Sequence, residues 1–81
     1  MRLTFKKRFF ALTKRRQEVA MLATHGLSNP AIAEKLDLTE GTVKQHLHKI
    51  YKTLDLHSRI ELLMAVAKLP RAKAEGAGGP N

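Results

Sequence analysis

Four hydroxyl-bearing residues each stand directly before a stretch whose apolar residues recur at helical spacing. They are Thr13, Ser28, Thr39 and Ser58. A serine or threonine in this position caps a helix, because its side-chain oxygen accepts a hydrogen bond from a free backbone N–H of the first turn. The chain has no convincing alternation of apolar and polar residues, which a half-buried strand would show. The sequence therefore predicts an all-α fold with four helices.

The predicted helices are separated by residues that favour turns. Gly26 offers the left-handed backbone position that commonly ends a helix. Ser28 is the expected cap of the second helix, with Asn29 as the competing candidate. Only Asp37 and Leu38 separate the second helix from the third, and so short a turn is typical of a helix-turn-helix. The helices are expected at about 14–24, 29–36, 40–54 and 59–69.

Length and charge limit the kind of function. A chain of 81 residues has room for one small core and none for an ordinary enzyme fold, and without cysteine that core is held by packing alone. Fifteen Lys and Arg against seven Asp and Glu give a net charge of +8, which favours nucleic acid as the partner. We expect a cytoplasmic protein without membrane association, because no apolar run approaches the roughly 20 residues of a membrane span and no secretory signal is recognisable.

The two ends of the chain differ in composition from the middle. Residues 1–16 carry seven of the fifteen cations and no acid, so residues 1–11 are interpreted as a basic arm or linker. Residues 70–81 begin with a helix-stopping proline and are rich in glycine, which predicts a disordered tail. The folded unit is expected at about 12–69. Membrane-surface binding by the phenylalanine-rich arm is a weaker alternative.

The third helix has one apolar side and one polar side. Val43, Leu47, Ile50 and Leu54 share the buried side, and the residues expected to face outward are Gly41, Lys44, Gln45, His48, Lys49 and Lys52. Lys44, Gln45 and His48 are candidates for reading bases, because lysine donates to guanine, glutamine pairs with adenine and histidine donates or accepts. Lys49 is expected at the DNA backbone. An ordinary solvated helix face is the alternative interpretation.

The fourth helix begins with Ser58 and Glu61, a capping box in which each side chain is expected to accept from the other residue's backbone N–H. This helix is apolar on both sides. We expect Ile60, Leu63, Met64 and Ala67 to face the core. The opposite stripe then predicts a dimer interface about a two-fold axis, formed by Leu62, Ala65, Val66 and Leu69. In the alternative, the N-terminal arm folds back over that stripe.

Several spaced motifs resemble the LuxR/GerE-type helix-turn-helix domain over about residues 12–67. They include Leu-Thr-Lys-Arg-Arg-Gln-Glu-Val at 12–19, Gly-Leu-Ser-Asn at 26–29, Leu-Asp-Leu-Thr-Glu-Gly-Thr-Val-Lys-Gln-His-Leu at 36–47 and Ser-Arg-Ile-Glu-Leu at 58–62. The resemblance implies a four-helix DNA-binding domain of a bacterial transcription regulator that dimerises through its last helix. It also implies a nearby receiver or ligand-binding domain, with RNA polymerase as a further partner.

The resemblance implies residue roles as well. Positions matching Lys44, Gln45 and His48 face base edges in the family. Positions near the phosphate backbone match Asn29, Thr39, Thr42 and Lys52. Lys44, Gln45, His48 and Lys52 coincide with the outward side of the third helix identified above.

Four positions depart from the pattern of the family it resembles. Glutamate is usual where Arg16 stands and common where Ala31 stands, so two capping boxes are missing at a cost of roughly 0.5–1 kcal/mol each. Arg16 also opposes the helix dipole, although it lowers the repulsion of phosphate. Pro30 replaces a frequent lysine and removes a phosphate contact. Asp55 replaces the usual glycine, which predicts an aspartate with left-handed backbone.

Two other classes of function compete with this interpretation. An enzyme is the weakest, because the four histidines show no metal-ligand spacing and His46 and His48 point to different sides of a helix. No catalytic residue, metal or cofactor is therefore predicted. His46 is expected beside the buried stripe or near the backbone of bound DNA. The stronger alternative is a protein-interaction module that pairs through the fourth helix with another regulator and modulates it.

Overall fold

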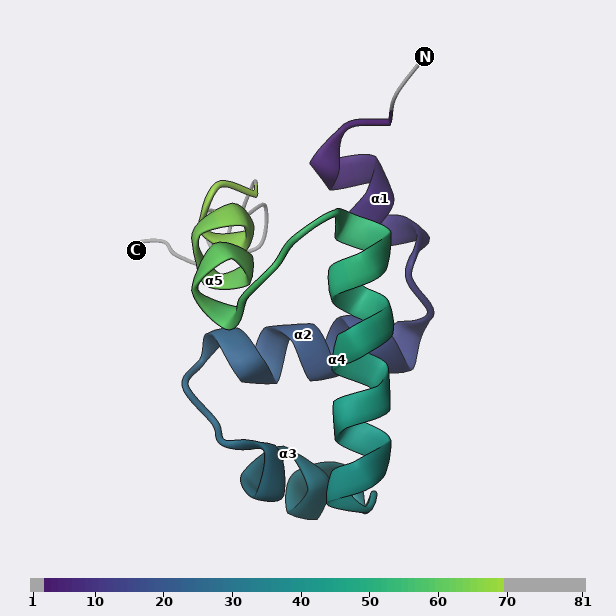
Figure 1. The fold of residues 1–81 in the computed structure, drawn as a ribbon, viewed down its shortest axis with the longest axis vertical. Coiled ribbons are helices and arrows are strands. Elements are labelled where there is room, and N and C mark those ends of the chain that lie inside the picture. Colours follow the sequence, from purple (N-terminus) through teal and green to yellow (C-terminus); the bar gives the residue numbers. More distant parts are fainter. Residues whose placement is uncertain (1–2, 70–81) are drawn as a thin grey trace, which may run out of the picture.

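A computed structural model describes residues 3–69 of the chain and shows helices joined by short connections (Figure 1). The all-α prediction is confirmed, with five helices in the described residues instead of four. The helices are α1 (Phe5–Ala11), α2 (Lys14–Thr24), α3 (Asn29–Leu36), α4 (Glu40–Leu54) and α5 (Arg59–Ala67). The predicted tail at 70–81 lies outside the described residues.

The predicted caps and turns are present. Backbone N–H groups three residues later donate, at 3.1 to 3.3 Å, to the side-chain oxygens of Thr13, Ser28, Thr39 and Ser58. Gly26 follows α2 with a φ of 89°. Asp55 ends α4 with a φ of 59°, so the expected left-handed aspartate is confirmed, and Asp37 ends α3 in the same conformation. Local capping chemistry therefore sets most of the helix ends.

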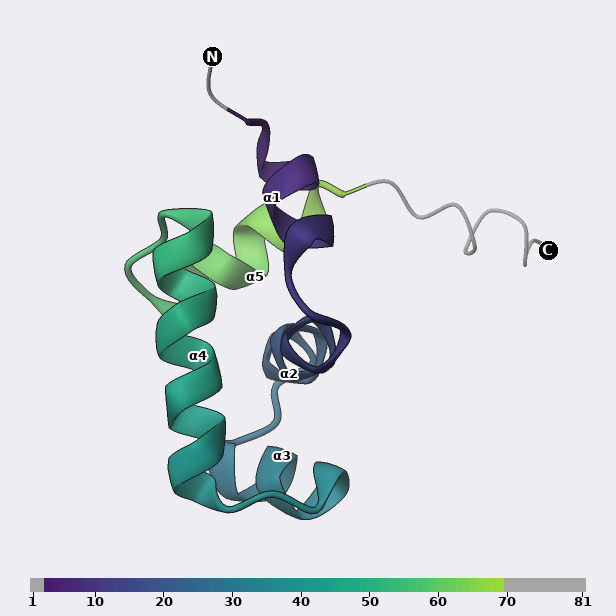
Figure 2. The same ribbon diagram turned by 90° about the vertical axis from the view of Figure 1, so that its right-hand side faces the viewer.

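One core holds the helices together. Its buried side chains are Phe9, Leu12, Val19, Ala20, Ala23, Ile32, Ala33, Val43, Leu47, Ile50, Leu54 and Leu62. α2 crosses α4 near its middle, and α3 packs beside one end of α4 (Figure 1). In Figure 2, α4 runs along one edge of the molecule with α1, α2 and α3 on its inner side. One long side of α4 is consequently left uncovered.

The residues predicted as an arm or linker form α1 instead. Thr4 caps this helix by accepting from the N–H of Lys7 at 3.2 Å. Phe5 and Phe9 lie one turn apart on the same side, with ring centroids 6.2 Å apart, and Phe9 is buried in the core. In the sequence, three basic residues stand between Phe5 and Phe9, so the segment has the composition of a charged linker rather than of a core helix. The folded unit therefore includes α1.

The orientation predicted for α5 is wrong. Leu62, assigned to an outward dimer stripe, is 0% exposed and lies in the core, and Val66 and Leu69 pack against it. The expected core residues Ile60 and Met64 are instead 68% and 58% exposed. Because both sides of this helix are apolar, its periodicity cannot choose between them. Packing against α2 decides the orientation.

The start of α5 differs in detail from the predicted capping box. Ser58 accepts from the N–H of Glu61 at 3.2 Å as expected. The carboxylate of Glu61 accepts from the N–H of His57 at 2.8 Å rather than from that of Ser58. Ser58 is almost fully extended at φ −159°, and the N–H presented to Glu61 is that of the preceding residue. Both ends of the box still satisfy a backbone donor.

Candidate nucleic-acid interface

The uncovered side of α4 is built by the burial of the opposite side. Val43, Leu47, Ile50 and Leu54 are all nearly or fully buried. Because these residues recur every three or four positions, the polar residues between them project away from the core. The outward residues match the prediction and are exposed: Gly41, Lys44, Gln45, His48, Lys49 and Lys52.

The three residues predicted to read bases share this exposed side. Lys44 forms an ion pair with Glu40 one turn earlier, with 3.6 Å between Nζ and Oε2. Both side chains are largely exposed, so water and salt screen this pair and a stronger acceptor can displace it. Gln45 and His48 form no hydrogen bond or ion pair with the part of the chain that the structure describes. Their polar groups are therefore available.

The residues predicted at the phosphate backbone are less uniform. Thr39 and Thr42 stand at the start of α4, where Thr39 accepts from the N–H of Thr42 at 3.1 Å and donates to its hydroxyl at 2.9 Å. Asn29 lies elsewhere, at the start of α3, and its side-chain oxygen accepts a hydrogen bond from Arg59. Arg59 also donates to the carbonyl of Leu27 at 3.0 Å. Asn29 is thus part of a clamp between α5 and the α2–α3 connection.

Arg16 adds a cation to this interface from a different helix. It lines a groove of about 340 Å³ together with His48, Lys49, Lys52 and Thr53, and no carboxylate borders the groove. The structure therefore joins α2 to the outward side of α4 in one basic surface. The sequence had shown Arg16 only as a departure from the resembled pattern. The sequence alone does not show that α2 packs against α4 and so brings Arg16 next to His48 and Lys49.

The positive charge of this surface acts on a neighbouring histidine. His46 lies half-buried on the flank of α4 nearest α2, beside the buried stripe as expected. Burial lowers the pKa of His46, and the nearby charges of Arg16, Arg15 and Lys49 lower it further. The imidazole is thereby biased toward its neutral form. Three cationic side chains therefore lie close enough to this flank of α4 to disfavour a further positive charge there.

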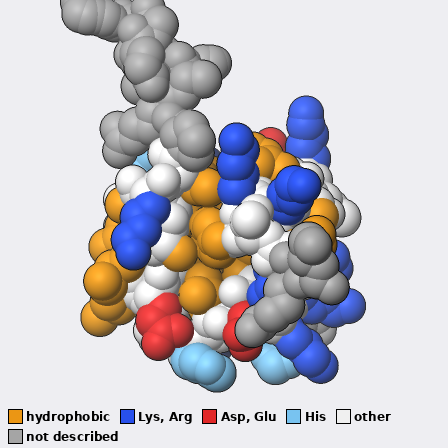
Figure 3. Space-filling view, turned by 90° about the horizontal axis from the view of Figure 1, so that it is seen from above, with side chains coloured by type: hydrophobic (Ala, Val, Ile, Leu, Met, Phe, Trp, Pro, Cys, Tyr) orange, Lys and Arg blue, Asp and Glu red, His pale blue; other side chains and the backbone are white. Residues whose placement is uncertain are grey.

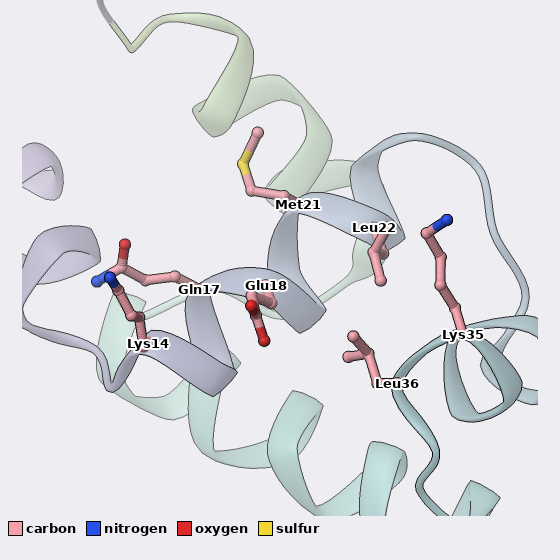
Figure 4. Close-up of a pocket in the computed structure, with 7 residues that line it drawn as sticks. All are labelled: Lys14, Gln17, Glu18, Met21, Leu22, Lys35 and Leu36. Atoms are coloured by element: carbon pink, nitrogen blue, oxygen red, sulfur yellow. The ribbon is translucent and has the colours of Figure 1, made fainter.

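Two further grooves are largely apolar and lie away from this basic surface. One lies between α2 and α3, and its lining includes the apolar side chains of Met21, Leu22 and Leu36 and the charged side chains of Lys14, Glu18 and Lys35 (Figure 4). A second lies between α1 and α5, where Phe5 faces Ala65 and Leu69. The first described residues form one wall of this groove and residues of α5 form the other, while α1 itself packs mainly against α4. Seen from the end of the molecule at which α1 and α5 lie, hydrophobic side chains form an open patch among scattered cations (Figure 3).

Neither metal nor membrane features accompany these grooves. Among residues 3–69, no group of three His, Cys, Asp or Glu side chains has a geometry that could hold a metal ion. None of the described helices combines the length and apolar character needed to cross a bilayer.

Comparison with known proteins gives one consistent family. Residues 11–66 match the model for bacterial regulatory proteins of the luxR family. The chain is 37% identical over 70 residues to the two-component response regulator PprB of Pseudomonas aeruginosa, covering 86% of this chain and 25% of that protein. It is 40% identical over 60 residues to the nitrate/nitrite response regulator NarL of Escherichia coli, covering 74% of this chain and 28% of that protein.

A relative from Bacillus subtilis matches a shorter stretch. The transcriptional regulatory protein LnrK of Bacillus subtilis is 46% identical over 50 residues, which is 62% of this chain and 23% of LnrK. The chain thus spans about a quarter of the length of the curated relatives it matches.

Proposed function

The chain belongs to the luxR family of bacterial regulatory proteins, and we propose that it binds double-stranded DNA sequence-specifically as part of a transcription regulator. α4 lies in the major groove in this proposal. Lys44, Gln45 and His48 read base edges, and the flanking contacts to phosphate come from Asn29, Thr39, Thr42, Lys49 and Lys52. The DNA-binding domain proposed from the sequence at about 12–69 is extended by α1, whose Phe9 belongs to the same core.

The uncovered side of α4 is the observation that carries this proposal. An α-helix with its side chains is about 10–12 Å across, which matches the major groove at about 12 Å. The exposed residues along this side include three lysines and, after Glu40, no acid. Gln45 supplies the paired donor and acceptor that adenine requires. Gly41 adds no side chain where the start of the helix approaches the DNA.

We propose that two copies pair through α5 on the DNA. The exposed residues of this helix, rather than the stripe containing Leu62, carry the proposal: Ile60, Leu63 and Met64 project outward on one side. A two-fold protein pair matches two half-sites about one helical turn apart. Ala65, Val66 and Leu69 then serve mainly to hold α5 on its own core.

In vitro selection against randomised duplex DNA near physiological salt tests the proposal. We expect an enriched motif with two-fold symmetry, and the double variant Lys44→Ala, Gln45→Ala is expected to lose preference for it while remaining folded. Lys35→Ala is the control, because Lys35 borders the α2–α3 groove rather than the side of α4 proposed to read bases. Absence of enrichment by the unmodified protein would contradict the proposal. Enrichment of one unpaired half-site would contradict only the pairing.

The exposed apolar side of α5 favours a second candidate function, that of a module that pairs with another regulator and modulates it. In that case the Lys44→Ala, Gln45→Ala variant keeps its regulatory activity, and Leu63→Asp removes it. An upstream regulatory domain and RNA polymerase are the further partners that we propose for the main function.

A further inference from the structure

Arg16 is a guanidinium held without a counterion. Its Nε–H is buried and donates to no acceptor among residues 3–69. Its neighbour Arg15 differs, because it pairs with Glu18 across 3.3 Å. Buried donors are rarely left unsatisfied in native proteins, and each such group calls for an explanation. The Nε is enclosed by protein atoms whereas the two terminal Nη groups are not, so an acceptor supplied by a bound partner would reach this guanidinium through its Nη groups.

The other groups at the same groove are also donors. Lys49 and Lys52 form no ion pair with any residue that the structure describes, and Thr53 adds a hydroxyl. No carboxylate belongs to the lining of this groove, and Glu18, two residues after Arg16, is paired with Arg15. Three cations and a hydroxyl around one groove match the oxygens of a phosphate, which arginine binds through two parallel hydrogen bonds.

The position of the groove relative to α4 also fits DNA. Lys52 lies near the centre of the exposed side of α4, whereas Lys49 and Thr53 lie on the flank that faces α2. In a helix that fills the major groove, the middle of the exposed side faces the base edges, and each flank faces one of the two phosphate backbones. Arg16 stands beyond the Lys49 flank, where one of these backbones would run.

We propose that Arg16, with Lys49 and Thr53, forms a phosphate-binding site that extends the DNA contact from α4 onto α2. This inference rests on the proposed function, since the phosphate belongs to the backbone of the bound duplex. The site accounts for a cation in the first turn of α2, where it opposes the helix dipole. It fixes the tilt of the domain on DNA by adding a contact outside the helix-turn-helix.

The test measures binding to a fluorescent duplex of about 20 base pairs by anisotropy over a range of salt concentrations. The slope of log affinity against log salt is negative, and loss of one phosphate contact is expected to reduce its magnitude by about 0.9. Arg16→Ala is expected to show this change and to weaken binding about tenfold at low salt. Arg16→Lys should recover most of the slope. Lys35→Ala, with the same change of net charge, should leave the slope within error of the unmodified protein.

Two further variants separate binding from folding. Arg16→Met keeps the aliphatic stem and removes the charge, so it should bind like Arg16→Ala and unfold at the temperature of the unmodified protein. If Arg16→Ala and Arg16→Met bind with the same slope as Lys35→Ala, the site on α2 is overturned while DNA binding stands. If the unmodified protein binds no duplex at any salt concentration, the proposed function and this site both fall.

Discussion

α4 and α5 are both helices with a buried stripe, yet their sequences constrain them differently. In α4 every residue opposite the stripe from Val43 to Leu54 is polar or glycine, so only one orientation buries apolar surface without burying charge. In α5 apolar residues occupy both sides, and either orientation buries a similar amount. The outward residues of α4 were predicted correctly, whereas those of α5 were inverted.

The difference teaches that a polar side orients a helix as strongly as an apolar one does. α5 lacks that second constraint, and its orientation is set by contacts made elsewhere. Arg59 anchors its first turn to the α2–α3 connection, and Leu62 follows three residues later into the core. The side opposite Leu62 is then left in solvent.

The orientation of α5 is tested most directly by shortening one buried and one exposed side chain of this helix in separate variants. Leu62→Ala is expected to lower the free energy of unfolding by about 2–5 kcal/mol, because it opens a cavity at a fully buried site. Leu63→Ala removes a 45% exposed side chain and should cost less than about 1 kcal/mol. Urea denaturation of both variants measures the difference.

A chain this small has little stability to lose, so Leu62→Ala can fall below the range that denaturation resolves. Leu62→Met conserves volume and is expected to cost under about 1.5 kcal/mol, which keeps the comparison measurable. A larger loss for Leu63→Met than for Leu62→Met would mean that the sequence-based orientation of α5 is the right one.

The second prediction concerns the anchor that fixes this orientation. Arg59→Ala removes two hydrogen bonds, one to the carbonyl of Leu27 and one to Asn29, and should cost about 1–3 kcal/mol. Arg59→Lys keeps the charge but offers no planar fork, so an intermediate loss is expected. Hydrogen exchange of the α2–α3 connection should quicken in step. Unchanged stability in Arg59→Ala would show that packing alone orients α5.

The features predicted correctly from the sequence are those that depend on local interactions. The caps at Thr13 and Thr39 and the left-handed Asp55 depend on neighbours a few residues away, and all were predicted correctly. α1 was missed because its stripe is only Phe5 and Phe9, which count as core only when α4 is beside them. The contribution of Arg16 was missed for the same reason, since the groove it lines exists only after α2 crosses α4.

A smaller effect is expected at the start of α4, where the polar side is interrupted by Gly41. A methyl group there meets only the hydroxyl of Thr39 at 3.9 Å, which is ordinary contact. Gly41→Ala should therefore stabilise the fold by up to about 1 kcal/mol through helix propensity. The same methyl would stand between α4 and the DNA, so affinity for the selected duplex should fall. Tighter binding together with higher stability would place the DNA farther from this end of α4.

The smallest expected effect is a pH dependence of stability that comes from α4 and not from α5. α4 carries His46, whereas α5 contains no histidine. Burial, followed by the charges of Arg16, Arg15 and Lys49, lowers the pKa of His46 in the folded protein. The unfolded chain therefore binds more protons at this site, and stability from His46 is full above about pH 6.5 and decreases as the pH falls. His46→Gln should remove this component, so the difference in unfolding free energy between the two proteins should be constant near pH 8 and shift in favour of the variant below about pH 6. Arg16→Ala should retain the component but reduce its size, because one of the charges that lower this pKa is gone. A difference between the unmodified protein and His46→Gln that stays constant over this whole pH range would mean that the cations of α2 do not act on α4 as their positions indicate.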